Sequence, residues 1–256
     1  MDSGQSLPPG GWSCEDSIWQ LVESGGYGAD LPLWTRLGKG RRVLDLGAGI
    51  GRVAHHIAGV AAGVTGLDAD PRFVADFNRL APAGATARVA DVLDPGLCPG
   101  EFDLVIAPQQ LVQIIGGRDQ RKKFFRMLAR SLAEGGTAAI TITGELPRQS
   151  MTAELTPDLR EIGGWVFSSR PTALRAAKDE VTVERIRHRV SPSGDLAESI
   201  SRVSFSRITA NQLIPELESC GLFRCRETRI PPTDDHMGSA VLLLGRPRGR
   251  QPAPPQ

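Results

Sequence analysis

The sequence predicts an α/β fold: a seven-stranded, mostly parallel sheet whose last strand is antiparallel, helices on both faces, and a small antiparallel cap. Two observations predict it. Between residues 42 and 143, short apolar runs typical of strands alternate with segments of helical periodicity, which is the order of β-α units in a parallel sheet. Between 144 and about 208, extended segments follow one another without helices. This change predicts a cap inserted after the fifth strand.

The first half of the chain predicts the strands of the parallel sheet and the helices between them. Asp70 and Pro71 supply an N-cap and a first-turn proline for a helix through residue 80. A longer helix over 119–133 should stop at the two glycines 135 and 136. The helix after the first strand should bury an apolar stripe made of Val53, Ile57 and Val60. We expect strands at 42–46, 64–67, 87–90, 102–107 and 137–143.

The second half predicts the cap and the completion of the sheet. Thr209 and Gln212 form a capping-box pattern that starts a helix through residue 220. Two strands joined by a loop should follow it. The expected extended segments are 165–167, 181–190, 197–205, 222–230 and 240–244. The predicted units are an N-terminal helical or lid segment (1–40), a core (41–144), the cap (145–208), the completed core (209–245) and a disordered tail (246–256).

Composition excludes several classes of protein. The 256 residues carry 30 basic and 29 acidic side chains, a net charge of +1, which disfavours nucleic acid as the main partner. No apolar run approaches the ~20 residues needed to span a bilayer, and no signal peptide is visible. The cysteines lack metal-ligand spacing: Cys14, Cys98, Cys220 and Cys225. We expect a cytoplasmic protein without a metal, either a monomer or a homodimer, and the bias to Arg, Ala, Gly and Pro suggests a bacterial source.

A glycine-rich turn follows the first predicted strand. It reads Gly47-x-Gly49-x-Gly51, with Asp45 two residues before the first glycine. Glycines suit such a turn because they tolerate positive φ and let the backbone approach a ligand closely. A dinucleotide-binding turn has the spacing G-x-G-x-x-G, and here the third glycine comes one residue early. This spacing opposes an NAD(P)-dependent oxidoreductase.

The turn, with Asp45 before it, resembles motif I of the class I S-adenosylmethionine (SAM) methyltransferases, of the small-molecule type found in bacteria. The resemblance extends over residues 20 to 245 and implies a Rossmann-like fold with SAM as cofactor and S-adenosylhomocysteine (SAH) as product. It also implies that the last two strands place an antiparallel strand at the edge of the sheet. It implies that the turn meets the methionine moiety, with Asp45 accepting from the ammonium group. Acidic residues also end the next two strands: Asp68 suits the ribose hydroxyls and Asp91 the adenine amino group.

The remaining expected cofactor contacts follow from the same resemblance. Tyr27, the one tyrosine of the chain, precedes motif I where relatives carry a tyrosine that closes over the methionine carboxylate. The alternative for Tyr27 is a packed loop aromatic. The full expected cofactor-binding set is Tyr27, Asp45, Gly47, Ala48, Gly49, Gly51, Asp68, Ala69, Asp91, Val92 and Ala107.

The acceptor side is less specific. After the fourth strand, nucleic-acid amino-methyltransferases carry Asn/Asp-Pro-Pro-aromatic, whereas this chain reads Ala-Pro-Gln-Gln-Leu-Val-Gln over residues 107–113. Its glutamines either line a pocket or cap a helix. The candidate catalytic residues are His236, His188 and Gln113, with His236 first because its loop lies at the end of the sixth strand. His55 and His56 are expected to be structural.

We therefore expect methyl transfer to a nitrogen or oxygen of a small molecule, with a bacterial secondary metabolite as the substrate class and the cap as a lid over the acceptor. A general base at a hydroxyl acceptor typically adds ~10²–10⁴-fold to the rate. Two alternatives stay open: a protein that binds SAM without transferring methyl, in a regulatory or scaffold role, and an NAD(P)-dependent oxidoreductase.

Overall fold

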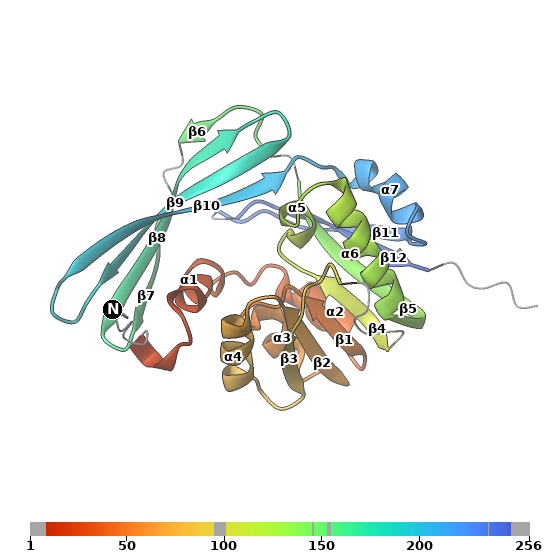
Figure 1. The fold of residues 1–256 in the computed structure, drawn as a ribbon, viewed down its shortest axis with the longest axis horizontal. Helices are drawn as coiled ribbons and strands as arrows, with labels where there is room; N and C mark the ends of the chain where they lie inside the picture. The colour runs from red at the N-terminus through yellow and green to blue at the C-terminus, as the bar shows by residue number, and fades with distance from the viewer. Residues whose placement is uncertain (1–8, 95–100, 145, 153–154, 235, 247–256) are drawn as a thin grey trace, which may run out of the picture.

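The main sheet of the computed structural model has seven strands in the order β11-β12-β5-β4-β1-β2-β3 (Figure 1). The model describes residues 9–94, 101–144, 146–152, 155–234 and 236–246. The strands are β1 (Arg42–Leu46), β2 (Gly63–Asp68), β3 (Ala85–Val89), β4 (Phe102–Ala107), β5 (Leu132–Thr143), β11 (Phe223–Ile230) and β12 (Ser239–Gly245). Neighbours from β3 to β5 pair in parallel, and β12 pairs antiparallel with both β5 and β11. The predicted fold class is confirmed.

The resemblance implied an antiparallel strand at the edge of the sheet, but the antiparallel strand β12 lies one place inside the edge. β12 pairs with β5 along Ser239↔Thr143 to Gly245↔Thr137, and β11 then adds to its outer side. The strand β12 is apolar and almost fully buried, whereas most residues of β11 are exposed. Burial therefore sets the order: the more apolar of the two strands takes the inner position.

Helices cover both faces of the main sheet, and alternate strand residues point into two separate cores. One core joins Leu44 and Val105 to Phe124 and Leu213 from helices on one face. The other joins neighbouring strand residues such as Val43 to the helices of the opposite face. The helices are α1 (Glu15–Ser24), α2 (Leu31–Gly38), α3 (Arg52–Ile57), α4 (Pro71–Leu80), α5 (Leu111–Ile114), α6 (Arg118–Ser131) and α7 (Ala210–Glu218).

Helix ends follow the predicted capping. The Asp70 carboxylate accepts from the backbone N–H of Arg72 at 2.8 Å, and Thr209 forms a complete capping box with Gln212. Two local expectations were wrong. The chain enters β5 directly after Ser131, where pairing with β4 extends the strand past the glycine pair. Val60 is exposed because α3 ends at Ile57, one turn before it.

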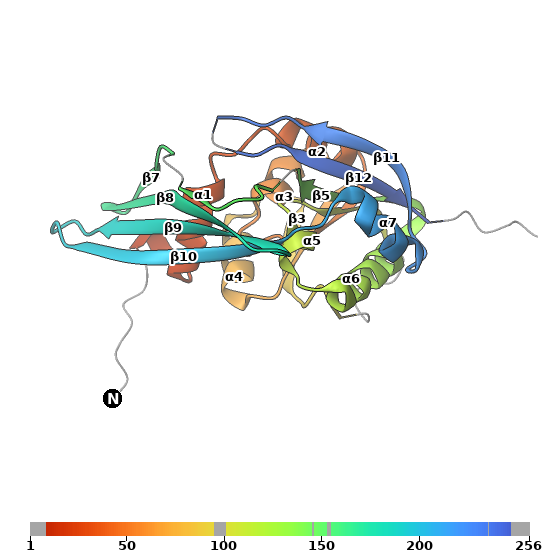
Figure 2. The ribbon, with the colours of Figure 1, turned by 90° about the horizontal axis from the view of Figure 1, so that it is seen from above.

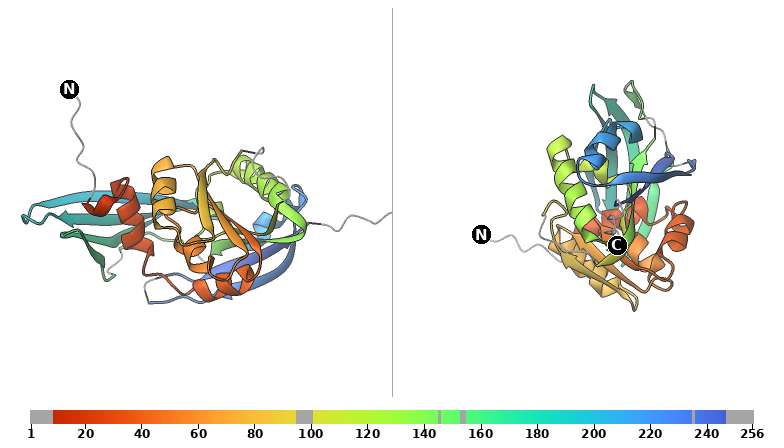
Figure 3. Two further views of the ribbon diagram at one scale, coloured as in Figure 1. Left: turned by 90° about the horizontal axis from the view of Figure 1, so that it is seen from below. Right: turned by 90° about the vertical axis from the view of Figure 1, so that its right-hand side faces the viewer.

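The second sheet extends away from the main sheet, beyond its covering helices (Figures 2 and 3). Its order is β10-β9-β8-β6, and β7 also pairs with β8. The strands are β6 (Met151–Thr152), β7 (Asp158–Ile162), β8 (Trp165–Ala176), β9 (Glu180–Val190) and β10 (Leu196–Ser206). The chain leaves the main sheet after β5 and returns at α7, which is where the sequence predicted an inserted antiparallel cap. Residues 247–256 of the expected tail lie outside the described residues.

Across the described parts of the chain, no helix is both long enough and apolar enough to cross a membrane. The same residues contain no group of three or more His, Cys, Asp or Glu side chains that could hold a metal ion. Cys14, Cys220 and Cys225 are free thiols, and Cys98 lies outside the described residues.

Candidate cofactor and acceptor site

The glycine turn connects β1 to α3 at the carboxyl edge of the parallel strands. Gly47, Gly49 and Gly51 have φ values of 65°, 54° and 95°, in the left-handed region that favours glycine. A Cβ on Gly51 would lie 2.4 Å from Nε2 of His55. The spacing Gly-x-Gly-x-Gly thus reflects a backbone that favours glycine at all three positions.

Asp68 holds the turn against β2. Its Oδ2 accepts from the backbone N–H of Gly49 at 2.9 Å, and its Oδ1 accepts from the N–H of Asp70 at 3.0 Å. Ala48 donates to the carbonyl of Leu67 at 2.9 Å, so the turn is also bonded to the β2 backbone. Each carboxylate oxygen keeps a second lone pair for a hydroxyl donor. Asp68 therefore both shapes the turn and retains capacity to bind a ligand.

Asp45 lies buried at the end of β1 with one oxygen unsatisfied. Among the described residues, its Oδ1 has no hydrogen-bond partner. Burial raises the pKa of Asp45 to about 7, an effect that the nearby Arg52 guanidinium partly offsets. A buried carboxylate oxygen without a donor is costly unless a ligand supplies one. The oxygen fits a cationic donor such as the ammonium group of an amino acid, which supports the expected SAM site.

Other predicted cofactor residues lie at the ends of the neighbouring strands. Ala69 follows β2 and is exposed, and Asp91 follows β3, where its Oδ1 accepts from the N–H of Leu93 at 2.8 Å. Val92 packs against the main core beside that turn. Ala107 is fully buried at the end of β4. The parallel strands bring all four residues to one edge of the sheet, as expected.

An ion pair closes the site from the N-terminal side. Arg52, the residue after the third glycine, donates to both carboxylate oxygens of Asp30, at 2.8 Å and 2.6 Å, and to the carbonyl of Tyr27 at 2.8 Å. Its guanidinium also lies 5.2 Å from the centroid of the Tyr27 ring. Arg52 thereby fixes the loop before α2 against the glycine turn.

A cavity of about 140 Å³ opens beside this loop. One water needs ~10–15 Å³ of such space, so the cavity has room for about ten waters. A small organic ring system fits in this space. Apolar side chains from the cap face hydroxyl, amide and imidazole groups from the core. The lining comprises Tyr27, Asp30, Gln109, Gln110, Thr141, Thr143, Leu146, Val183, Phe205, Ile230, His236, Met237 and Ser239.

Tyr27 and His236 meet in this cavity. Their rings stack with centroids 4.4 Å apart and planes inclined by 26°. Burial, followed by the nearby Asp30 carboxylate, raises the pKa of the Tyr27 phenol above its ordinary value, so the hydroxyl stays protonated. The sequence had assigned these residues to the cofactor and to catalysis separately. The structure places them in contact.

The two glutamines after β4 adopt a strained backbone. Gln109 and Gln110 have φ values of 53° and 60°, in the region that residues other than glycine seldom occupy. Two hydrogen bonds hold the turn. Gln110 donates from its backbone N–H to Oγ1 of Thr141 and from its side-chain Nε2 to Oγ of Ser239, both at 3.0 Å. The turn presents Gln109 to the cavity, which fits the predicted lining role.

Two candidate catalytic residues do not line the cavity. Gln113 is buried, with Oε1 accepting from the N–H of Thr143 at 2.7 Å and Nε2 donating to the carbonyl of Ser206 at 3.2 Å. Both ends of its amide are therefore used to join β5 to β10. His188 points to the outer face of the cap, where its Nε2 lies 2.9 Å from Oε2 of Glu198. Its strand neighbours Arg187 and Arg189 take the face toward α1.

The histidines expected to be structural lie outside the cavity. His55 packs edge-on against Phe77, with ring centroids 4.3 Å apart. His56 lies 3.0 Å from the hydroxyl of Thr35 through its Nε2.

Sequence reasoning missed several residues of the site. Arg52 and Asp30 are 22 positions apart, so only the place of Arg52 directly after the third glycine hinted at its role. Thr141, Thr143 and Ser239 belong to strands β5 and β12, whose pairing the sequence does not state. Gln20 of α1 bonds to the glycine turn through the backbone N–H of Ile50, at 3.1 Å. No signal in the sequence marked Gln20.

Comparisons with known proteins bear on this site. Residues 43–136 match the family model described as a methyltransferase domain. No curated protein matches the chain.

Many solved structures share the fold. The amino pentose methyltransferase CalS10 of Micromonospora echinaspora, solved with SAM bound, has 17% identity and a TM-score of 0.69, over 88% of this chain and 96% of that one. The sugar N-methyltransferase KedS8 of Streptoalloteichus has 18% identity and a TM-score of 0.67, over 94% and 97%. The glycopeptide N-methyltransferase MtfA, solved with SAH, has 16% identity and a TM-score of 0.60, over 91% and 98%. At these identities the likeness shows the fold.

Proposed function

We propose that the chain transfers the methyl group of SAM to a nitrogen of a small molecule, with oxygen as the second choice. The match of residues 43–136 to a methyltransferase domain model supports this proposal. The observation that carries the proposal is the cavity beside the loop of Tyr27 and Asp30, which Arg52 joins to the glycine turn. It is lined by Tyr27, His236 and polar residues of the core, and by Val183 and Phe205 of the cap.

The chain's own groups divide into two sets. Asp45, Asp68 and Asp91 lie at consecutive strand ends and are proposed to bind the ammonium, ribose and adenine groups of the cofactor. When bound, SAM supplies an electrophilic methyl group on a sulfonium sulfur. The leaving thioether is neutral, so the protein has no developing anion to stabilise. The cavity needs only to exclude water and to hold the acceptor atom in line with the bond from sulfur to the methyl group. Such orientation can lower the activation barrier by ~7–11 kcal/mol.

His236 is the proposed proton acceptor. Its imidazole lines the cavity and stacks on Tyr27, so the ring is held in a fixed orientation. An ammonium group must lose its proton before the nitrogen can attack, and a ring nitrogen of a neutral imidazole can accept that proton. Tyr27 contributes by position, because its phenol stays protonated.

The nature of the cavity wall favours a polar but uncharged or cationic acceptor. Asp30, the one carboxylate among the described lining residues, is already paired with Arg52. The lining residues of the described chain include no lysine or arginine that would attract an anionic acceptor. The names of three structural relatives, an amino pentose, a sugar N- and a glycopeptide N-methyltransferase, support an amine on a sugar or peptide scaffold. A bacterial secondary metabolite is the proposed class of substrate.

Three further assignments belong to this proposal. The cap, residues 145–208, serves as the lid over the acceptor, since Val183 and Phe205 bring its strands to the cavity. The N-terminal segment, residues 1–40, closes the cofactor side through Tyr27 and Asp30. The protein works in the cytoplasm, where SAM is made, and neither nucleic acid nor a membrane is its partner.

Mass spectrometry with deuterated SAM tests the proposal. The protein is incubated with SAM carrying a CD₃ group and a panel of amino sugars and amine-bearing glycosides, with the matched hydroxyl compounds as a second panel. We expect one CD₃ group on an amine and none on the matched alcohol. Tight binding of SAM without a labelled product across both panels would favour the regulatory alternative.

A further inference from the structure

Helix α1 connects the glycine turn to the cap. A small hydrophobic core contains Ile18, Trp19 and Val22 of α1, Ile50 of the glycine turn and Phe167 of the cap. The Trp19 and Phe167 rings meet edge-to-face with centroids 5.2 Å apart. The backbone N–H of Ser13, just before the helix, donates to both carboxylate oxygens of Asp76 on α4, at 3.1 Å and 3.0 Å. The helix is thus fixed on three sides next to the glycine turn.

Gln20 projects from α1 onto the turn. Its Oε1 accepts from the backbone N–H of Ile50 at 3.1 Å. A Cβ on Gly49 would lie 2.3 Å from this oxygen, so the carboxamide rests directly on the glycine backbone. Because the N–H of Ile50 can only donate, the atom that faces it has to be the oxygen of the amide. The Nε2 group of Gln20 therefore takes the remaining position.

That Nε2 group is a free donor. Within the described part of the chain it has no hydrogen-bond partner, and it lies 3.2 Å from the position that a Cβ on Gly49 would take. The amino acid end of SAM carries a carboxylate besides the ammonium group that Asp45 fits. A neutral amide donor beside the glycine turn matches that carboxylate.

We propose that Gln20 is a cofactor-binding residue that donates from Nε2 to the carboxylate at the amino acid end of SAM. The inference rests on the cofactor and not on methyl transfer, so it holds or fails independently of the proposed acceptor.

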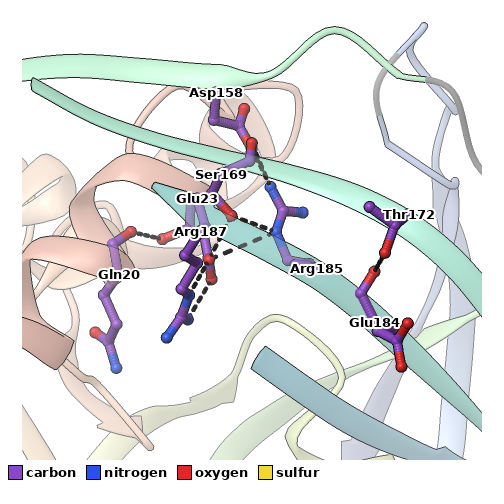
Figure 4. A network of polar contacts seen from close by, with 9 residues as sticks. Gln20, Glu23, Asp158, Ser169, Thr172, Glu184, Arg185 and Arg187 are labelled. Atoms are coloured by element: carbon purple, nitrogen blue, oxygen red, sulfur yellow. Dashed lines mark hydrogen bonds and ion pairs between the residues drawn. The ribbon is translucent and has the colours of Figure 1, made fainter. Parts of the chain in front are cut away.

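A charged cluster around Glu23, one helical turn after Gln20, joins α1 to the cap (Figure 4). Glu23 of α1 accepts from Nε and Nη2 of Arg187 at 2.7 Å and 2.9 Å and from the hydroxyl of Ser169 at 2.7 Å. Arg185 lies 3.5 Å from the same carboxylate and also pairs with Asp158. These side chains are largely shielded from solvent. Glu23 is therefore a positioning residue that couples the cap to the cofactor side.

Calorimetric titration with two ligands tests the role of Gln20. SAH carries the amino acid end, whereas 5′-methylthioadenosine keeps the adenosine and the thioether and lacks the carboxylate. Gln20→Glu retains an oxygen for Ile50 and loses the donor, and Gln20→Met loses both. We expect each variant to bind SAH about tenfold to a hundredfold more weakly, the value of a hydrogen bond to a charged group. Binding of 5′-methylthioadenosine should change less than twofold.

The other outcomes are distinct. If Gln20 only supports the turn, Gln20→Met weakens both ligands and Gln20→Glu weakens neither, which overturns the proposal. If wild-type protein binds neither ligand, the cofactor assignment fails instead. Thermal unfolding of each variant confirms that the fold is retained.

The positioning role of Glu23 is tested with a matched pair of variants on the same helix. Glu23→Gln is expected to weaken SAH binding at least threefold, because it loosens α1 above the turn. Glu15→Gln removes a second contact from α1 to β9, the exposed pair with Arg189, and should leave SAH binding unchanged. Equal effects of the two variants would contradict the positioning role of Glu23.

Discussion

The imidazole of His236 stacks on the phenol of Tyr27 with ring centroids 4.4 Å apart, which joins the loop between β11 and β12 to the segment before α2. The two residues are distant in sequence, yet both line the same cavity. The contact gives the imidazole a fixed orientation at the cavity wall. The proposed proton acceptor is therefore held by a ring contact within the protein.

We predict that His236→Gln lowers kcat by about 100-fold or more, the effect of removing a positioned base. SAM affinity should stay within twofold of wild type. Steady-state rates of formation of the methylated product give kcat, and calorimetry gives the affinity for SAM. His56→Gln is the matched control, because it makes the same change at a histidine that lies outside the cavity and contacts Thr35. Full turnover by His236→Gln would remove His236 from the chemistry.

SAM affinity should fall as the pH drops below about 7. Burial raises the pKa of Asp45 to about 7, so the carboxylate is increasingly protonated below that pH and no longer attracts the ammonium group. The loss approaches tenfold per pH unit. Calorimetry from pH 5.5 to 8.5 should show this slope in wild type and a flat, weaker profile in Asp45→Asn. A flat wild-type profile would show that Asp45 does not contact the cation.

Asp45 should also make stability fall with rising pH. Its folded pKa of about 7 lies above the model value of 3.8, so the folded state binds the proton more tightly. The stability present below pH 3.8 is lost as the pH rises through 7. Asp45→Asn should therefore gain on the order of 2–3 kcal/mol more, relative to wild type, at pH 8 than at pH 5. Urea unfolding at the two pH values measures this difference, and an equal gain at both would contradict the raised pKa.

Arg52→Met is predicted to destabilise the fold by about 3–5 kcal/mol, because it leaves the Asp30 carboxylate buried without its partner. The side chains of the pair are 13% and 3% exposed. Arg42→Met is the control: Arg42 pairs with Asp103 at 3.0 Å, but the two side chains are 56% and 40% exposed. That variant should keep the wild-type urea midpoint. If the two substitutions lower the free energy of unfolding equally, burial does not explain the contribution of the Arg52–Asp30 pair to stability.

Gln113→Leu tests whether Gln113 is structural. The substitution leaves the N–H of Thr143 and the carbonyl of Ser206 without their partner and should cost about 2 kcal/mol of stability. At a temperature where the variant is fully folded, kcat should remain within threefold of wild type. A large loss of kcat with unchanged stability would return Gln113 to the list of catalytic residues.

The sequence predicted the main sheet and the place of the glycine turn well because those features are local. The glycine spacing, the acidic residues at strand ends and the caps at Asp70 and Thr209 each lie within one β-α unit. Their positions follow once the strands are parallel, since all carboxyl ends then meet at one edge.

The acceptor side depended on contacts between distant segments. His188 alternates with Arg187 and Arg189 along β9, and these two arginines take the face toward α1 by pairing with Glu23 and Glu15. Gln113 looked like a lining residue until the ends of β5 and β10 met at its amide. The order of β11 and β12 likewise depends on which strand is buried, a property of the whole sheet.

The central claim is a SAM site built on the glycine turn, and parallel calorimetric titrations of wild type and Asp68→Ala with SAM and with NAD⁺ test it most directly. We predict that wild type binds one SAM per chain, that Asp68→Ala binds SAM at least tenfold more weakly, and that NAD⁺ gives no binding heat. Binding of NAD⁺ in the absence of SAM binding, or SAM affinity that is unchanged in Asp68→Ala, would contradict the account.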